Sequence, residues 1–118
     1  MNFFPGTLGS VSGGWEFRGA GFRLKLPPSG ELSSGPATLG VRPEDLRLSP
    51  NGVLRATVRV VEPIGSEVFV HLTTADGAPA IARAPADVQV TVEERVGFEI
   101  PPAKVHLFSG ASGVRIGP

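Results

Sequence analysis

His71 and His106 are the two residues of this 118-residue chain that most readily suggest metal binding or nucleophile activation. Either chemistry requires the two rings to meet and needs a third ligand or partner. The histidines lie far apart in the sequence, each within a strand-like stretch, and no further ligand type accompanies them at a suitable spacing. We therefore expect two structural histidines and predict no metal site.

Adjacent acids are the second candidate, because general acid-base catalysis uses two positioned carboxyl groups. The chain has two such pairs, Glu44 with Asp45 and Glu93 with Glu94. Neighbouring residues of a strand point to opposite faces of a sheet, so neither pair suits one substrate. We expect these acids to be solvated turn residues.

The serines and lysines lie outside catalytic and nucleotide-binding motifs. Ser10, Ser12 and Ser66 lie among turn-forming residues, without the strand-to-helix elbow that holds a nucleophilic serine. A phosphate-binding loop ends in Gly-Lys followed by Ser or Thr, whereas Lys25 follows a leucine and Lys104 follows an alanine. The chain by itself is predicted not to be an enzyme, with no catalytic, cofactor-binding or metal-binding residues.

The composition indicates one small domain held together by packing. The chain has no cysteine, which excludes disulfides and thiolate sites, and its 16 glycines and 12 prolines indicate many turns. Eleven basic residues balance eleven acidic ones, so no overall field attracts nucleic acid or another polyanion. No apolar stretch approaches the roughly 18 residues that cross a bilayer, so we expect a soluble protein.

Apolar residues recur at every second position, which predicts strands with one buried face. The pattern is clear at residues 22–26, 54–60 and 88–92. Residues 68–72 are apolar on nearly both faces, as in a strand at the centre of a barrel or against a partner, so we expect this strand to be the most buried. The pattern predicts an all-β fold of short antiparallel strands.

Turn-forming sequences separate these stretches. Residues 49–52 and 62–65 place Pro second and Gly fourth, which suits a type I turn, and Asp76-Gly77 suits a hairpin turn. Residues 42–46 suit a single helical turn, because Pro43 is tolerated there and two acids follow it. Helices of at most one turn are therefore expected.

The sequence indicates two parts with a weakly marked boundary, which together form one compact unit. Residues 1–36 are glycine-rich and are predicted to hold N-terminal strands and a junction. Residues 37–118 are denser in strand patterns and are predicted to form the main β-barrel region.

Four blocks in order resemble the C-terminal regulatory region of ATP-binding subunits of ABC importers of the maltose, glycerol-phosphate and multiple-sugar type. The blocks are the Asn-Phe phrase at residues 1–4, the Gly-Val-Arg-Pro-Glu signature at 39–46, the stretch 60–72, and the closing block 101–108. The resemblance covers essentially the whole chain. It implies a TOBE module, which is a small barrel of the oligonucleotide-binding (OB) type.

The resemblance also implies a function for the chain. In such importers two ATP-binding subunits work as a pair on the cytoplasmic side of two permease subunits, and their C-terminal domains stay in contact. A regulatory and dimerisation domain is therefore expected, with a second copy, permease subunits and an inhibitory regulator as partners and no nucleic acid. ATP and Mg belong to an ATPase domain that this sequence lacks, so we expect a fragment cut at a domain junction.

Six residues are the regulatory or interface candidates that the matching blocks suggest. They are Phe3, Gly40, Arg42, Glu44, Gly65 and Ser66. A structural interpretation carries equal weight for four of them. Phe3 would plug the end of the barrel, Gly40 would allow a bend, and Arg42 would form an exposed ion pair with Glu44.

Two alternative functions stay open. A stand-alone oxyanion-binding barrel, of the molybdate type, would need backbone amides and basic or hydroxyl groups around the anion, and Ser66 after Gly65 is the nearest candidate. A nucleic-acid-binding barrel would use an aromatic platform, for which Trp15, Phe17, Phe22 and Phe69 could supply rings, although alternation places Phe22 on the inward face.

Overall fold

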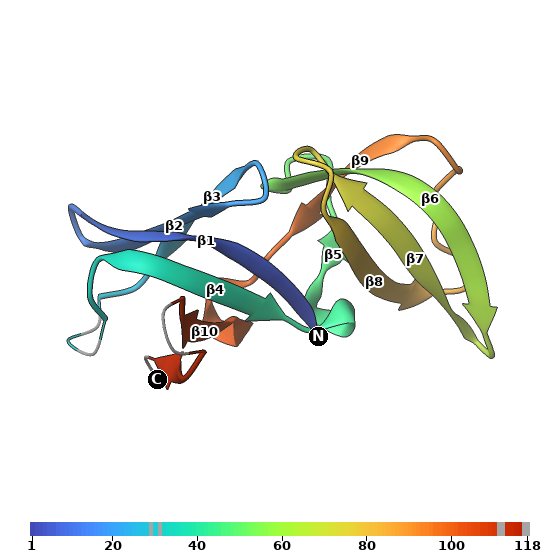
Figure 1. Cartoon of the computed structure of the whole chain (residues 1–118). Helices are drawn as coiled ribbons and strands as arrows, with labels where there is room; N and C mark the ends of the chain where they lie inside the picture. Colours follow the sequence, from blue (N-terminus) through green and yellow to red (C-terminus); the bar gives the residue numbers. More distant parts are fainter. Residues whose placement is uncertain (29, 31, 111–112, 117–118) are drawn as a thin grey trace.

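The chain folds into two antiparallel β-sheets joined by short turns, as the computed structural model shows for residues 1–28, 30, 32–110 and 113–116 (Figure 1). Two one-turn 3-10 helices, η1 (Pro43–Asp45) and η2 (Pro102–Lys104), complete it. Within these residues no helix combines the length and the apolar character that would let it cross a membrane. The all-β prediction with one-turn helices is confirmed.

The first sheet has six strands in the order β11-β10-β4-β1-β2-β3. Its strands are β1 (Asn2–Val11), β2 (Gly14–Gly19), β3 (Phe22–Leu26), β4 (Gly35–Val41), β10 (His106–Ser109) and β11 (Arg115–Ile116). The C-terminal strand β10 thus pairs with β4, so the two ends of the chain meet in one sheet. This pairing positions the surface described below.

The second sheet has five strands in the order β5-β9-β6-β7-β8. Its strands are β5 (Arg47–Leu48), β6 (Leu54–Ile64), β7 (Glu67–Thr74), β8 (Pro79–Pro85) and β9 (Arg95–Glu99). Edge strand β8 begins and ends with proline, a residue that sheets confine to edges because it cannot donate a backbone hydrogen bond.

One continuous core contains the inward-facing residues of both sheets. Phe4 packs edge-on against Phe22 with ring centroids 5.6 Å apart, and Phe17 lies beside Phe22. The ring of Phe17 is fully buried because Gly6 leaves room for it; a Cβ on Gly6 would lie 2.6 Å from Cζ of Phe17. Burying such a ring contributes about 1.5 to 3 kcal/mol to stability.

A buried amide connects the two sheets. The side chain of Asn2 on β1 donates from Nδ2 to the carbonyl oxygens of Ile81 (2.8 Å) and Val41 (3.2 Å). Its Oδ1 accepts a hydrogen bond from the backbone N–H of Ile81 at 2.7 Å. Asn2 therefore pairs with both backbone groups of Ile81 on edge strand β8, as a neighbouring strand would.

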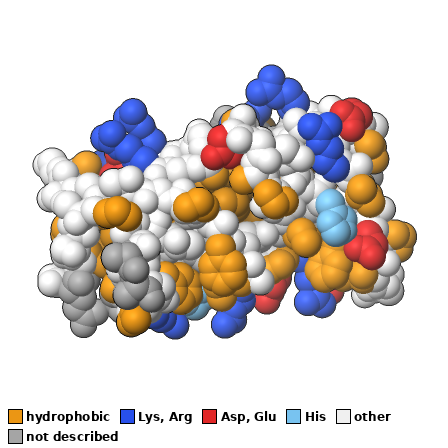
Figure 2. Space-filling view, in the orientation of Figure 1, with side chains coloured by type: hydrophobic (Ala, Val, Ile, Leu, Met, Phe, Trp, Pro, Cys, Tyr) orange, Lys and Arg blue, Asp and Glu red, His pale blue; other side chains and the backbone are white. Residues whose placement is uncertain are grey.

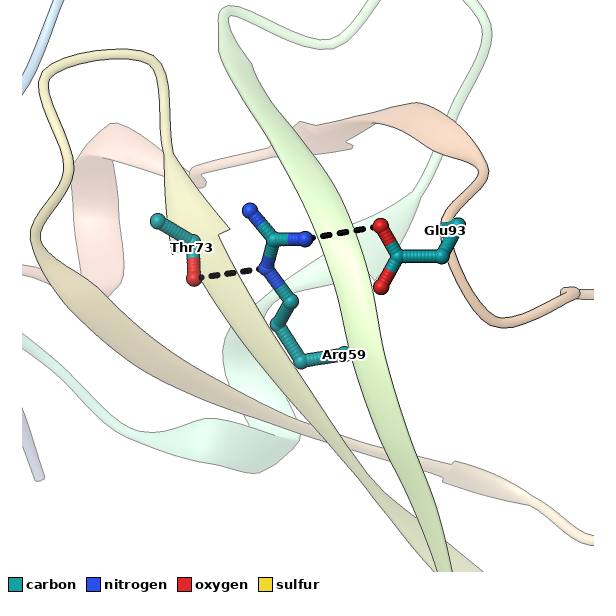
Figure 3. Close-up of polar contacts among 3 residues, drawn as sticks. All are labelled: Arg59, Thr73 and Glu93. Atoms are coloured by element: carbon teal, nitrogen blue, oxygen red, sulfur yellow. Dashed lines mark hydrogen bonds and ion pairs between the residues drawn. The ribbon is translucent and has the colours of Figure 1, made fainter.

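A β-bulge in β6 places Arg59 where its side chain contacts both β7 and the loop before β9. The register with β7 shifts between Val58 and Val60, which leaves Arg59 as the extra residue. Arg59 Nε lies 3.1 Å from Thr73 Oγ1, and Arg59 Nη1 lies 2.8 Å from Glu93 Oε2 (Figure 3). Glu93 has a φ of +74°, a conformation that costs energy for any residue with a Cβ.

Three of the predicted elements are confirmed and two are wrong. Strands form at 22–26 and 54–60, and η1 lies inside the predicted turn 42–46. Residues 88–92 alternate in polarity but form no strand, because none of the described strands pairs with them. The turn predicted at 62–65 lies later, at Gly65-Ser66, since β6 continues to Ile64.

The central strand and the remaining turns match the sequence patterns in part. Residues 49–52 form a turn closed by a 3.0 Å bond from the Gly52 N–H to the Ser49 carbonyl oxygen. Asp76-Gly77 lies in the turn after β7, with the φ of Gly77 at +89°. Residues 68–72 lie in interior strand β7, where buried residues alternate with half-buried ones rather than being buried on both faces.

We expect Asn2→Ala to lower the free energy of unfolding by about 2 kcal/mol, because it leaves both backbone groups of Ile81 without their partner. Urea unfolding followed by circular dichroism measures the change. Thr7→Ala, at an exposed position of the same strand, is the control and should change stability by less than about 0.5 kcal/mol. An Asn2→Ala midpoint equal to that of the control would contradict the role of the amide.

Glu93→Gly should be more stable than Glu93→Ala by about 1 kcal/mol. Both variants lose the exposed ion pair with Arg59, whereas only glycine adopts the positive φ without steric cost. Thermal unfolding of the two variants side by side gives the difference. Equal stability would show that the backbone at this position carries no strain.

Candidate interaction surface

The outer face of the six-stranded sheet brings predicted candidates together. Phe3 on β1 and His106 on β10 both lie directly opposite Gly40 on β4, so all three residues face the same side. The opposite face of these strands carries buried residues such as Phe4 and Leu39. Strand alternation thus places Phe3 toward solvent, with 56% of its surface exposed.

An aromatic cluster covers Gly40. Phe3 and Phe108 meet edge to face, with ring centroids 5.8 Å apart and an interplanar angle of 67°. A Cβ on Gly40 would lie 2.7 Å from Sδ of Met1 and 3.1 Å from Cε2 of Phe108. A larger residue would make these side chains shift, so Gly40 lets them pack closely onto the backbone of β4. We call Met1, Phe3 and Phe108 the aromatic cluster.

A shallow charged hollow lies beside the aromatic cluster. Its ionisable lining residues come from the η1 region, η2, β10 and β11 and are Arg42, Glu44, Asp45, Lys104, His106 and Arg115. Lys104 Nζ lies 3.7 Å from Asp45 Oδ1, a distance typical of a weak ion pair. Arg42 and Glu44 form no ion pair with each other in the part of the chain that the structure describes.

Arg83 extends the charged surface onto edge strand β8. Its Nη2 and Nε lie 2.7 Å and 3.0 Å from Oε1 of Glu67. This hydrogen-bonded carboxylate raises the pKa of the Arg83 guanidinium, and the charge of Glu44 on η1 acts in the same direction. Arg83 therefore stays protonated, and Glu44 lies within the field of a cation from the other sheet.

Gly65 and Ser66 lie apart from the other candidates. They form the exposed turn between β6 and β7, at the end of the molecule away from β10 (Figure 1). Gly65 has a φ of +78°, which the turn requires, and the Ser66 carbonyl oxygen accepts a 3.2 Å bond from the Ala86 N–H. Neither residue lines the charged hollow.

The histidines also lie on different sheets. His71 on β7 has Nε2 2.9 Å from Oε1 of Glu62 on β6, whereas His106 on β10 lines the charged hollow. Among the described residues, no group of three or more His, Asp or Glu side chains is arranged to hold a metal ion.

Sequence reasoning missed Asn2, Phe108 and Arg115. Asn2 and Phe108 lie inside the first and last of the four blocks, so the blocks marked the segments without identifying these contacts. The alternation of β10 could have placed Phe108 on the outer face, because Leu107 beside it is an obvious core residue. The pairing of β10 with β4, however, could not be predicted, because the sequence of neither strand indicates which strand it pairs with.

Comparison with known proteins places the chain in a family. Residues 39–108 match the TOBE domain. The chain is 37% identical over 123 residues to the xylose/arabinose import ATP-binding protein XacK of Haloferax volcanii, covering 96% of this chain and 31% of that protein. It is 37% identical over 92 residues to the sn-glycerol-3-phosphate import ATP-binding protein UgpC of Brucella abortus, covering 72% and 26% respectively.

A third relative is the alpha-glucoside transport ATP-binding protein AglK of Rhizobium meliloti, 30% identical over 114 residues, with 92% of this chain and 32% of that protein covered. The chain therefore spans less than a third of the length of these relatives. Since the TOBE match extends over more than half of its residues, this chain belongs to the TOBE domain family.

Proposed function

We propose that this chain is the regulatory domain of the ATP-binding subunit of an ABC importer for sugars or related solutes. The observation that carries the proposal is the similarity to an import ATP-binding protein along 96% of the chain. The missing phosphate-binding loop fits this role, because ATP and Mg would be bound by another domain of the subunit.

The proposed partners follow from this role. A second copy of the subunit would meet this domain, the permease subunits would be reached through the ATPase domain, and an inhibitory regulator would act on it. The subunit would lie at the cytoplasmic face of the membrane. Such a regulator must bind the open and the closed arrangement of the two subunits with different affinity. Equal affinity for both would leave the equilibrium between them unchanged.

The outer face of the six-stranded sheet has the chemistry of a contact surface. The aromatic cluster exposes Phe3 and Met1, and buried aromatic anchors supply much of the energy of protein interfaces. Arg42 and Glu44 lie beside it and would form the charged rim. We assign the contact with a second copy to the aromatic cluster and the regulatory contact to Arg42 and Glu44, with Gly65 and Ser66 as candidates for a separate contact.

We expect the chain to form a reversible dimer that Phe3→Asp weakens at least about tenfold, because a charge would be buried at the contact. Sedimentation velocity from about 10 to 500 µM protein measures the association. Val53→Asp, which adds the same charge at another exposed apolar side chain, is the control. A monomer at every concentration, or equal weakening by both substitutions, would contradict the assigned contact.

In the full-length subunit, reconstituted with its permeases, Glu44→Lys should change the ratio of solute-stimulated to basal ATP hydrolysis by about threefold or more. The affinity for ATP should stay unchanged, because Glu44 is exposed and lies outside the ATPase domain. Asp87→Lys, at an exposed loop position, makes the same charge change as a control. A changed ATP affinity, or an unchanged ratio in a folded protein, would count against a regulatory contact at η1.

A further inference from the structure

Two guanidinium groups in the charged hollow have no acidic partner among the described residues. Arg42 and Arg115 line the hollow with Lys104 and His106, yet neither arginine forms an ion pair in that part of the chain. In Figure 2, basic side chains lie at separate places over the surface, some of them along the lower margin of the molecule. Two arginines without an ion pair among the described residues thus line one hollow, where a ligand would reach both of them.

The strand register explains why these residues converge. Arg115 on β11 lies opposite Phe108 on β10, and His106 lies opposite Gly40 on β4, so their side chains share the outer face. Arg42 follows β4 in an extended conformation, with a φ of −74° and a ψ of 149°, and lines the same hollow. Two regions that are distant in the sequence, residues 42–45 and the C-terminal residues Lys104, His106 and Arg115, therefore contribute to one site.

The acids of the hollow do not cancel its positive charge. Asp45 is engaged by Lys104 at 3.7 Å, and Glu44 lies in the field of Arg83. Among the lining residues, the three basic groups of Arg42, Lys104 and Arg115 outnumber the two acids by one formal positive charge. The chain as a whole has a formal net charge of 0, so this excess is local to the hollow.

We propose that the charged hollow binds the phosphate group of a small phosphorylated molecule. The planar fork of each arginine matches two phosphate oxygens, and His106 and Lys104 supply further donors. The acids Glu44 and Asp45 would repel an extended polyanion, which restricts the site to one phosphate group. The ring of Phe108, opposite Arg115, offers an apolar surface to the rest of the molecule.

The site depends only on the geometry of this domain. Its use rests on the proposed function: in an importer subunit, a phosphorylated solute at this position beside Glu44 would report that intracellular supply is sufficient. Binding and regulation are therefore tested by separate measurements.

The binding test uses the whole chain and follows amide and arginine side-chain NMR signals during titration with inorganic phosphate, glucose 6-phosphate and acetate. We expect saturable binding of both phosphates at about 1 mM or tighter, with shifts at Arg42, His106 and Arg115. Acetate should bind at least about tenfold more weakly, because a carboxylate carries less charge and has fewer acceptor atoms.

The double variant Arg42→Gln with Arg115→Gln should bind phosphate at least about tenfold more weakly. The matched control is Arg23→Gln with Arg47→Gln, which removes two exposed charges from strands β3 and β5 and should change affinity by less than about twofold. Unchanged circular dichroism verifies folding of both.

Three results would overturn the proposal: no saturable binding, equal losses in the two double variants, or acetate binding as tightly as phosphate. Glucose 6-phosphate binding more tightly than inorganic phosphate would support the contribution of Phe108, and equal affinities would limit recognition to the phosphate group. Failure of phosphate binding with an intact dimer would leave the proposed function standing, because the dimer contact is assigned to the aromatic cluster, which shares only Phe108 with the proposed phosphate site.

Discussion

The hydrogen bonds of Asn2 hold the two sheets of this domain in one arrangement. Apolar contacts between the sheets have no preferred direction, so they alone do little to stop one sheet from sliding against the other. The amide of Asn2, which is 8% exposed, matches the N–H and the carbonyl of Ile81 together with the carbonyl of Val41, and this match is met at one position only. The start of β1 is therefore fixed against β8, and the residues beside Asn2 are fixed with it.

The positions of the side chains on the outer face of the six-stranded sheet follow from this arrangement. Once β1 is fixed, Phe3 must face away from the core, and the pairing of β1, β4 and β10 places Gly40 and Phe108 beside it. The small size of Gly40 lets the side chains of Met1, Phe3 and Phe108 lie close to the sheet. One face of the sheet thus carries core residues such as Phe4 and Leu39, and the other presents Phe3 to solvent.

The sequence predicted what local patterns determine. Alternation predicted the strands at 22–26 and 54–60, and it failed at 88–92 because alternation does not supply a pairing partner. Pro63 suggested a turn too early. The ladder between β6 and β9 ends at Thr57, well before Pro63, so proline is tolerated there. Matching blocks selected Phe3, Gly40, Arg42 and Glu44, whereas the convergence of Arg42 with Arg115 depends on strand order, which no short segment encodes.

The bulge at Arg59 has a consequence for how this strand can change over evolution. Before it, even-numbered residues of β6 such as Ala56 and Val58 are buried; after it, odd-numbered Val61 lies opposite buried Val70. Loss of one residue here would exchange the inward and outward positions of the remaining strand, Val60 and Glu62 included. The number of residues in β6 around the bulge is therefore constrained in relatives that keep the hairpin. A substitution at Arg59, by contrast, leaves unchanged which residues of the strand face inward and which face outward.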